Sequence, residues 1–271
     1  MKTIPLNNKT NIPLLGFGTW HLSSQDCHKA VSAALKTGYR HIDCAPVYGN
    51  QKAVGKAIKE SGISRKDLFI TSKAWRIHLR EEDLPRVLKE TLRQLNTTYL
   101  DLYLIHWPNR RIPIKETLVA MQKLKDQGLI RAIGVSNFTI NHLKSALKTK
   151  IEISNNQVEF HPSFNQKELK KFCDEQNIAL TAYSPLAQGR DLKLPIIQKI
   201  AKKHNRFESQ VILNWLRAKK IIAIPRSAKE KHIIDNFKSL EWELDPQEVK
   251  DIDNVKVNKR LLAPFFAEFN L

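Results

Sequence analysis

Short apolar runs that alternate with charged, amphipathic stretches are the feature that most restricts what this chain can fold into. Eight such runs recur, at residues 14–20, 40–43, 68–75, 99–106, 130–137, 152–160, 178–184 and 221–227. The stretches between most of them, such as "EEDLPRVLKETLRQL", carry apolar residues at helical spacing. Alternating strands and helices predict parallel strands, and eight units in about 250 residues predict a (β/α)8 barrel of the α/β class.

The two ends of the chain add to this barrel. The opening "TIPLNNKTNIPL" has the composition of a small β-hairpin with Asn7 and Asn8 at its turn. Nothing after residue 240 resembles a further strand, and the apolar, aromatic end "NKRLLAPFFAEFNL" predicts a segment that packs against the rest. Since no linker interrupts the pattern, we expect a single domain over residues 1–271.

A dinucleotide-binding Rossmann fold is the competing architecture. Gly16 and Gly18 follow a strand, as in the GxGxxG fingerprint, but His21 stands at the third glycine position. No acidic residue is placed to receive a ribose at the end of a second strand. The barrel is therefore the preferred prediction.

Composition narrows the functional classes. No apolar run approaches the roughly 18 residues of a membrane span, and the N-terminus lacks a signal-peptide pattern, so we expect a cytoplasmic protein without membrane attachment. Cys27, Cys44 and Cys173 are scattered and predict free thiols. The net charge of +18 comes from lysines spread over many helical segments, without a basic tract interleaved with aromatic residues. The pattern argues against nucleic-acid binding.

Polar or amphipathic residues stand where the predicted strands end. Because the active site of such a barrel lies at the carboxyl ends of its strands, this set is the candidate site. Taken singly, each residue is more often structural than catalytic. The set is Asp43, Lys73, His106, Ser136, Asn137, Gln157 and Tyr183.

At this point the residues carry a resemblance to a known family. The motifs "GFGTW", "GYRHIDCAPVYGNQKAVGKAI", "FITSKAW", "YLDLYLIHWP", "IGVSNF", "NQVEFHP", "YSPLAQG" and "IPRSAKEKHIIDNF" resemble the aldo-keto reductases across essentially the whole chain. Within that family the chain is most similar to the bacterial 2,5-diketo-D-gluconate and methylglyoxal reductase branch. The resemblance implies a metal-free, monomeric, NADPH-dependent carbonyl reductase whose catalytic tetrad maps to Asp43, Tyr48, Lys73 and His106.

The chemistry of these four residue types fits carbonyl reduction. A carbonyl oxygen that gains negative charge needs a proton donor, and a tyrosine such as Tyr48 remains protonated at neutral pH. We expect Lys73 to lower the pKa of Tyr48 and Asp43 to keep Lys73 charged. His106 would hold the carbonyl oxygen by a hydrogen bond.

By the same resemblance, a second group would bind the cofactor. Ser136, Asn137 and Gln157 would hold the nicotinamide carboxamide, and Tyr183 would stack on its ring. The loop after the seventh strand would line the pyrophosphate, and phosphate would bind where a helix begins after the eighth strand. The remaining cofactor residues are Ser184, Leu186, Gln188, Arg226, Ser227, His232 and Asn236.

Three positions depart from the family pattern. The usual lysine before Ser227 is Arg226, which keeps a cation for a ribose 2'-phosphate. The usual arginine five residues beyond is His232, which puts discrimination against NADH in doubt and makes NADH use an open alternative. The usual glutamate after "YGN" is Gln51, which removes a charge near the mouth.

The substrate is left open among small dicarbonyls, keto sugars, keto acids and aromatic aldehydes. The resemblance places the C-terminal loop over the barrel mouth, with an aromatic pocket from Trp20, Trp75, Trp107, Phe265 and Phe266, although core packing is the alternative for Trp107. A cofactor-binding regulatory protein on this fold would tolerate loss of the acid, and an isomerase or lyase would need a glutamate base. The intact tetrad argues against both.

Overall fold

The structure is a computed structural model that describes residues 2–7 and 10–269. Within that part, eight parallel strands form one sheet in the order β10-β9-β8-β7-β6-β5-β4-β3. Their bounds are β3 Phe17–Gly18, β4 His41–Asp43, β5 Phe69–Ala74, β6 Leu100–Ile105, β7 Ile130–Ser136, β8 Asn155–Glu159, β9 Ala179–Tyr183 and β10 Ile222–Ala223. The prediction of a (β/α)8 barrel is confirmed.

The sheet closes between its shortest strands, β3 and β10. Leu15 forms a parallel bridge with Ala223, whose N–H donates to the Leu14 carbonyl at 2.9 Å, and the Gly16 N–H donates to the Ala223 carbonyl at 2.8 Å. The strands expected over seven residues each, 14–20 and 221–227, are only two residues long. The barrel closes through a few contacts between their backbones instead of a long ladder of hydrogen bonds. A Cβ on Gly18 would lie 2.9 Å from the Ile224 carbonyl oxygen.

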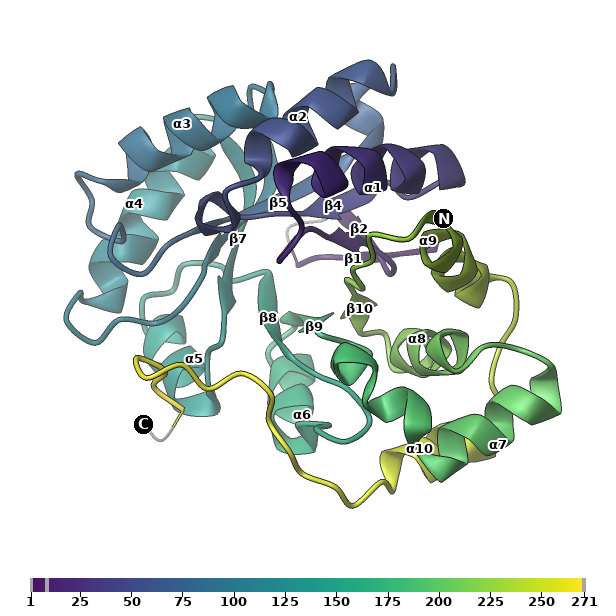
Figure 1. Ribbon diagram of the computed structural model, residues 1–271. Coiled ribbons are helices and arrows are strands. Elements are labelled where there is room, and N and C mark those ends of the chain that lie inside the picture. Colours follow the sequence, from purple (N-terminus) through teal and green to yellow (C-terminus); the bar gives the residue numbers. More distant parts are fainter. Residues whose placement is uncertain (1, 8–9, 270–271) are drawn as a thin grey trace.

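Helices surround the sheet, as Figure 1 shows. Short 3-10 turns η1 Pro46–Tyr48, η2 Arg65–Asp67, η3 Ala187–Gly189, η4 Asp191–Lys193 and η5 Lys238–Leu240 lie between the longer elements. The helices are α1 Ser24–Thr37, α2 Gln51–Glu60, α3 Leu84–Leu95, α4 Ile114–Asp126, α5 Ile140–Leu147, α6 Lys167–Glu175, α7 Pro195–His204, α8 Glu208–Ala218, α9 Glu230–Phe237 and α10 Pro246–Asp253. No helix in the described part of the chain is long and apolar enough to cross a membrane.

Local sequence explains several helix ends. Ser23 caps α1 by accepting from the Asp26 N–H at 3.1 Å, and Gly38 ends it with φ at 120°. Thr139 caps α5, and Asp245 forms a capping box before Pro246 in α10. These signals fix where each connection reaches the sheet.

The N-terminal hairpin is confirmed as the antiparallel pair β1 Thr3–Pro5 and β2 Asn11–Pro13. Of its expected turn, Asn7 is a turn residue and Asn8 lies outside the described residues. The hairpin contributes to an apolar cluster with the inner faces of the strands, made of Leu6, Ile12, Leu14, Phe69, Leu102, Leu104, Ala132 and Ile222. Since Phe69 begins β5, this cluster fills the amino end of the barrel.

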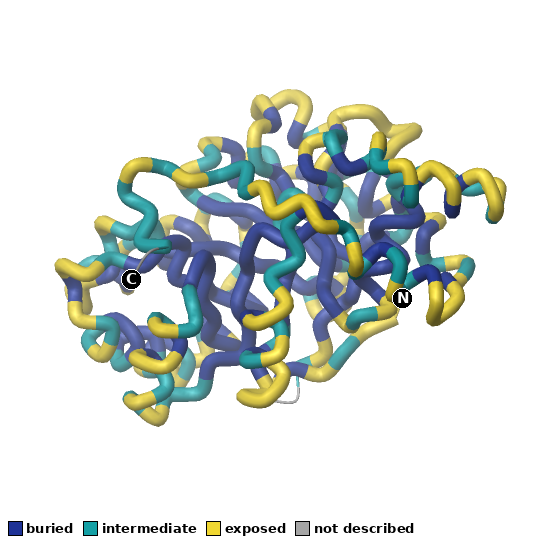
Figure 2. Tube along the Cα trace, turned by 90° about the horizontal axis from the view of Figure 1, so that it is seen from below, coloured by how far each residue is buried: buried dark blue, intermediate teal, exposed yellow. Residues whose placement is uncertain are grey.

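A larger core lies between the sheet and the helices, and the buried interior is visible in Figure 2. Side chains alternate across each strand, so every second residue points into the barrel. Along β5 the inward residues after Phe69 are Thr71 and Lys73, and along β6 Leu104 precedes His106. The barrel interior is thus apolar at one end and polar at the other. That residues 1–271 form a single domain stays a prediction.

Candidate active site

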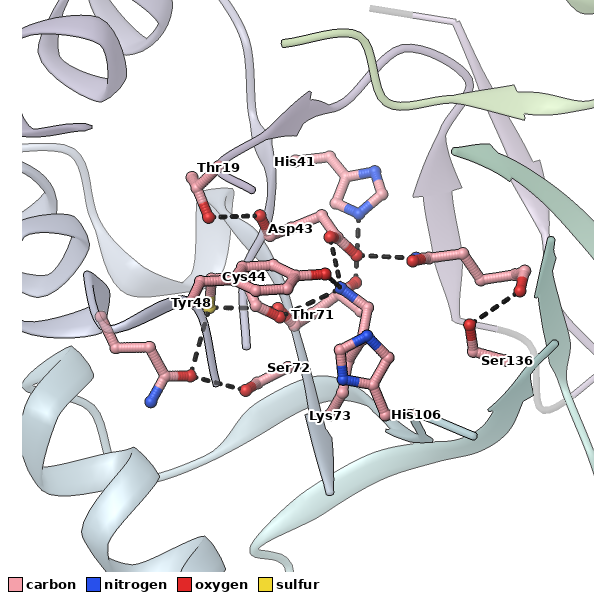
Figure 3. A network of polar contacts seen from close by, with 12 residues as sticks. Thr19, His41, Asp43, Cys44, Tyr48, Thr71, Ser72, Lys73, His106 and Ser136 are labelled. Atoms are coloured by element: carbon pink, nitrogen blue, oxygen red, sulfur yellow. Dashed lines mark hydrogen bonds and ion pairs between the residues drawn. The ribbon is translucent and has the colours of Figure 1, made fainter. Parts of the chain in front are cut away.

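The predicted tetrad meets at the carboxyl end of the barrel. The Lys73 ammonium lies 2.5 Å from Asp43 Oδ1 and 3.1 Å from the Tyr48 hydroxyl, and it also donates to the Cys44 carbonyl at 3.2 Å. Figure 3 shows the three side chains converging, with the His106 imidazole beside them. The structure therefore brings the four residues together.

Strand geometry positions the members of this cluster. Asp43 is the last residue of β4, and Lys73 lies next to the last residue of β5, both on the inward face. The His106 N–H donates to the Ala74 carbonyl at 2.9 Å, which fixes the residue just beyond β6. Tyr48, expected on a loop, ends the 3-10 turn η1, and Gly49 continues the chain with φ at 71°. The turn directs the phenol back over Lys73.

Two opposing effects act on the pKa of Tyr48. Burial is the larger and raises the pKa to about 12, while Lys73 lowers it, as predicted, and offsets only part of the rise. The phenol is therefore protonated at neutral pH. Burial works against the charge on Lys73, but Asp43 and Tyr48 outweigh it and raise the pKa of the ammonium. The prediction that Asp43 keeps Lys73 charged is consistent with this direction.

His106 is held as a neutral imidazole. Burial, followed by the nearby Lys73 charge, lowers its pKa well below the usual value. Its ring lies edge-on between the rings of Tyr48 and Trp75, with centroid distances of 5.7 and 5.2 Å. Its Nδ1 atom has no hydrogen-bond partner within the described residues. A neutral ring next to a phenol suits donation to an uncharged carbonyl oxygen.

Three amide or hydroxyl side chains extend the cluster across β7 and β8. Gln157 Nε2 donates to Asp43 Oδ2 at 2.7 Å, and Ser136 Oγ donates to the Gln157 carbonyl at 2.8 Å. Asn137, with φ at 64°, donates to the His106 carbonyl at 3.0 Å and accepts from the Tyr183 hydroxyl at 2.8 Å. Each predicted carboxamide-binding residue thus lies beside the tetrad.

One cavity of about 1120 Å³ joins these residues to the α9 end of the barrel mouth. It begins at Tyr48 and His106 and reaches exposed cations at the start of α9. The predicted cofactor residues that line it are Ser136, Asn137, Gln157, Tyr183, Ser184, Leu186, Gln188, Arg226, Ser227 and His232. Asn236 is not among the described lining residues, because its side chain is buried on α9.

The opposite end of the cavity is aromatic. Trp20, Trp75, Trp107 and Phe266 line it, and Phe266 stands edge-on to Trp75 and Trp107 at 5.6 and 5.5 Å. Phe265, expected in the same wall, does not line it and is fully exposed. The turn near Pro264 presents only one of the two phenylalanines to the pocket.

Two residues behind the tetrad, Gln51 and Cys44, are buried in the protein interior. Gln51 is buried, not at the mouth as expected; it accepts from Ser72 Oγ at 2.7 Å and donates to Gln94 at 3.3 Å. Cys44 is a free thiol, buried like Cys27 and Cys173, and burial raises its pKa. A neutral glutamine fits this enclosed position because it needs no counter-charge.

Sequence reasoning missed a second buried charged cluster near the site. Glu159, two residues after Gln157 on the same face of β8, is fully buried and faces His161 at 3.1 Å. The other nitrogen of His161 lies 3.1 Å from Asp191 in η4. The signal that could have revealed this cluster is a carboxylate, Glu159, on the inward face of a predicted strand.

Comparisons with known proteins agree with this geometry. Residues 14–257 match the model of the Aldo/keto reductase family. The chain belongs to this family. It is 42% identical over 261 residues to a glyoxal reductase of Bacillus subtilis (strain 168), covering 96% of this chain and 94% of that protein.

Two further relatives support the membership. The chain is 39% identical over 257 residues to methylglyoxal reductase DkgB of Escherichia coli O157:H7, covering 93% of this chain and 96% of that one. The solved structure of the aldose reductase from Schistosoma japonicum superposes with a TM-score of 0.94 at 33% identity, covering 98% and 96% of the two chains. As a family member, the chain is an oxidoreductase that acts on carbonyl groups with a nicotinamide cofactor.

Proposed function

We propose that this protein reduces small aldehydes and ketones with NADPH, using Tyr48 as the proton donor. The observation that carries the proposal is the Tyr48 hydroxyl, held 3.1 Å from the Lys73 ammonium at the end of a large cavity and edge-on to His106. The relatives named as glyoxal and methylglyoxal reductases favour small dicarbonyl substrates.

The cavity fits a phosphorylated dinucleotide. Amide and hydroxyl groups of Ser136, Asn137 and Gln157 lie at one end, where they would hold a carboxamide, and the Tyr183 ring would stack on the nicotinamide. Arg226 and Lys229 stand at the other end, where α9 begins. A helix N-terminus and cations suit a phosphate. The loop residues Ser184, Leu186 and Gln188 would line the pyrophosphate.

The chain's own residues would then manage the proton. The chemistry that a reduced nicotinamide would supply is a hydride for the carbonyl carbon, which would leave negative charge on the carbonyl oxygen. Neutral His106 would donate a hydrogen bond to that oxygen and orient it. Tyr48 would transfer its proton, and Lys73 would stabilise the resulting phenolate across 3.1 Å. Asp43 would keep the ammonium in place.

Activity with purified protein tests the proposal. Methylglyoxal, 2,5-diketogluconate and an aromatic aldehyde are assayed by oxidation of NADPH, with Tyr48→Phe as the variant. We expect turnover in the wild type and a loss of about 100-fold or more in the variant, with NADPH binding retained. Tight NADPH binding without reduction of any carbonyl would instead favour a cofactor-binding regulatory protein.

Cofactor preference is a separate prediction. His232 lines the cavity with Arg226, and an imidazole there lacks the permanent charge and planar fork with which a guanidinium binds a 2'-phosphate. We expect wild-type protein to use NADH measurably, and His232→Arg to raise the NADPH to NADH ratio of kcat/KM by roughly tenfold. Lys231→Arg is the control, and an equal rise there would contradict the role of His232. Cytoplasmic location, a monomeric state and no nucleic-acid or membrane partner remain predictions.

A further inference from the structure

The C-terminal segment, residues 255–269, crosses the barrel mouth and is called the strap below. It contains no helix or strand, and none of these residues is buried. In Figure 1 it runs in yellow from α10 past α6 to α5. A segment without regular structure or a buried side chain must be held by particular contacts.

The strap forms a partition between two cavities. Leu261 and Leu262 line the proposed substrate end of the cavity with Tyr48 and His106. The preceding residue, Arg260, lines a second cavity of about 610 Å³ toward α5 and α6. The Arg260 guanidinium stacks on the rings of Phe164 and Phe269, 4.5 and 3.6 Å from their centroids, whereas Leu261 and Leu262 stand beside the hollow space of the first cavity.

Hydrogen bonds to one buried carboxylate hold the backbone of Leu261 and Leu262. The Leu261 N–H donates to Glu159 Oε1 at 2.6 Å, and the Leu262 N–H donates to Glu159 Oε2 at 2.9 Å. Glu159 is fully buried at the carboxyl end of β8. Each oxygen therefore ties one backbone amide of the strap to the rigid sheet.

Charged neighbours hold this carboxylate in turn. Glu159 Oε1 also faces His161, whose second nitrogen faces Asp191 at 3.1 Å. The hydrogen bonds of both carboxylates outweigh burial and raise the pKa of His161. Ser163 donates to Asp191 through its hydroxyl at 2.6 Å and its N–H at 2.8 Å. The two carboxylates favour the protonated imidazole between them, and the two hydrogen bonds from Ser163 hold Asp191 in place.

A second contact joins this cluster to the strap just before Arg260. The Lys259 N–H donates to the Ser163 carbonyl at 3.0 Å, and Arg190 donates to the Lys259 carbonyl at 3.1 Å. Arg190 also donates to Ser163 Oγ at 3.0 Å. The anchors therefore cover residues 259–262, which include Leu261 and Leu262 of the cavity wall.

We propose that Glu159, held by His161 and Asp191, is a positioning residue that fixes the strap and thereby determines which carbonyl compounds the pocket accepts. The claim about substrate selection rests on the proposed function, whereas the claim that Glu159 fixes the strap does not. The backbone of Glu159 pairs with Tyr183 of β9, but the hydrogen bonds described for its carboxylate go to His161 and to the strap, not to the tetrad or to a proposed cofactor residue. It acts through Leu261 and Leu262.

Hydrogen–deuterium exchange tests the anchor without any substrate. Glu159→Gln replaces one accepting oxygen by an NH2 group, so one of the two strap amides loses its acceptor. We expect exchange in a peptide covering residues 256–269 to accelerate by about 10- to 100-fold relative to wild type. The matched control is Glu152→Gln, seven residues upstream, whose partially exposed carboxylate pairs with Lys125. It should leave strap exchange unchanged.

Kinetics test the consequence for substrates. In Glu159→Gln we expect KM for a bulky aromatic aldehyde to change by fivefold or more, and kcat and KM for methylglyoxal by less than about twofold. The dissociation constant of NADPH should be unchanged. A loss that is merely structural would instead lower kcat for all substrates together.

The outcomes separate the two proposals. If strap exchange in Glu159→Gln equals that of wild type, the anchor is overturned, whatever the kinetics. If exchange accelerates but KM for large and small carbonyls shifts equally, its role in selectivity is overturned. If wild type reduces no carbonyl, the proposed function fails, and the exchange result still decides the anchor. Should Glu159→Gln not fold, Leu261→Pro removes a donor from the strap alone and is held to the same outcomes.

Discussion

Two buried charged clusters lie at the mouth of this barrel, and they differ in what they hold. In one, Asp43 and Lys73 come from neighbouring strands and contact the Tyr48 hydroxyl. In the other, Glu159, which faces His161, accepts from two backbone amides of a segment without regular structure. The first cluster supports the proposed chemistry, and the second fixes the proposed substrate wall.

The difference lies in the support that each cluster receives. Strands held by parallel ladders on both sides keep Lys73 and Asp43 in place, so the first cluster would persist without the strap. Residues 259–262 of the strap are tied to the second cluster, whereas Glu268 near its end accepts from the Arg110 N–H at 3.1 Å. A barrel can therefore keep one set of reacting groups while its pocket wall changes, because the two are anchored separately.

The histidines of the two clusters also differ in charge. Burial and Lys73 hold His106 neutral, whereas Asp191 and Glu159 favour the protonated form of His161 despite burial. Lowering the pH therefore destabilises the folded state through protonation of His106, whereas raising the pH destabilises it through deprotonation of His161.

The largest expected effect comes from breaking the first cluster. Lys73→Met leaves the buried Asp43 carboxylate with only Gln157 as a side-chain partner among the described residues. We expect carbonyl reduction to fall by about 100-fold or more and unfolding free energy to fall by about 3–5 kcal/mol. Turnover assays and urea denaturation measure the two losses.

A double variant separates these losses. Asp43→Asn combined with Lys73→Met removes the unpaired charge, so we expect much of the stability to return while activity stays low. Recovered activity in the double variant would contradict the role of Lys73 in stabilising the Tyr48 phenolate.

A smaller effect is expected from acid. His41, on the inward face of β4, faces Thr71 at 3.1 Å, and burial lowers its pKa to about 4. Because the unfolded chain titrates near pH 6.5, it binds more protons than the folded chain between about pH 6.5 and 4. The contribution of His41 to stability is full above that window and falls as the pH decreases through it.

The pH dependence of urea denaturation measures this term. We expect His41 to account for a loss of roughly 2 kcal/mol between pH 7.5 and pH 5. His41→Gln is the comparison, since it cannot titrate and should show a correspondingly shallower decline. Equal slopes for the two proteins would mean that His41 protonates without opposing the fold.

The smallest effect is expected from removing an aromatic side chain of the strap. Phe266 packs against Trp75 and Trp107, so Phe266→Ala should raise KM for an aromatic aldehyde by about three- to tenfold. Phe265→Ala is the matched control, because its ring is fully exposed, and it should change KM by less than twofold. Similar shifts in both variants would show that strap mobility, not the Phe266 ring, governs the wall.

Much of the fold and site followed from local patterns. The positions of Asp43, Lys73 and His106 were predictable because parallel strands bring their carboxyl ends to one edge. The lengths of β3 and β10 were not, since barrel closure replaces their ladders with a few contacts. Phe265 was wrongly placed because neighbouring residues of an irregular segment can face opposite ways.

The sequence by itself determined the barrel, its hairpin, the family and the inward residues, because strand periodicity and chain order carry that information. Tertiary structure decided the direction in which the pKa of Tyr48 shifts, because that depends on how completely neighbouring elements bury the phenol. It also decided that Glu159 meets Leu261 and Leu262, about a hundred residues away. Contacts so distant in sequence leave no local pattern, and only the folded chain brings them together.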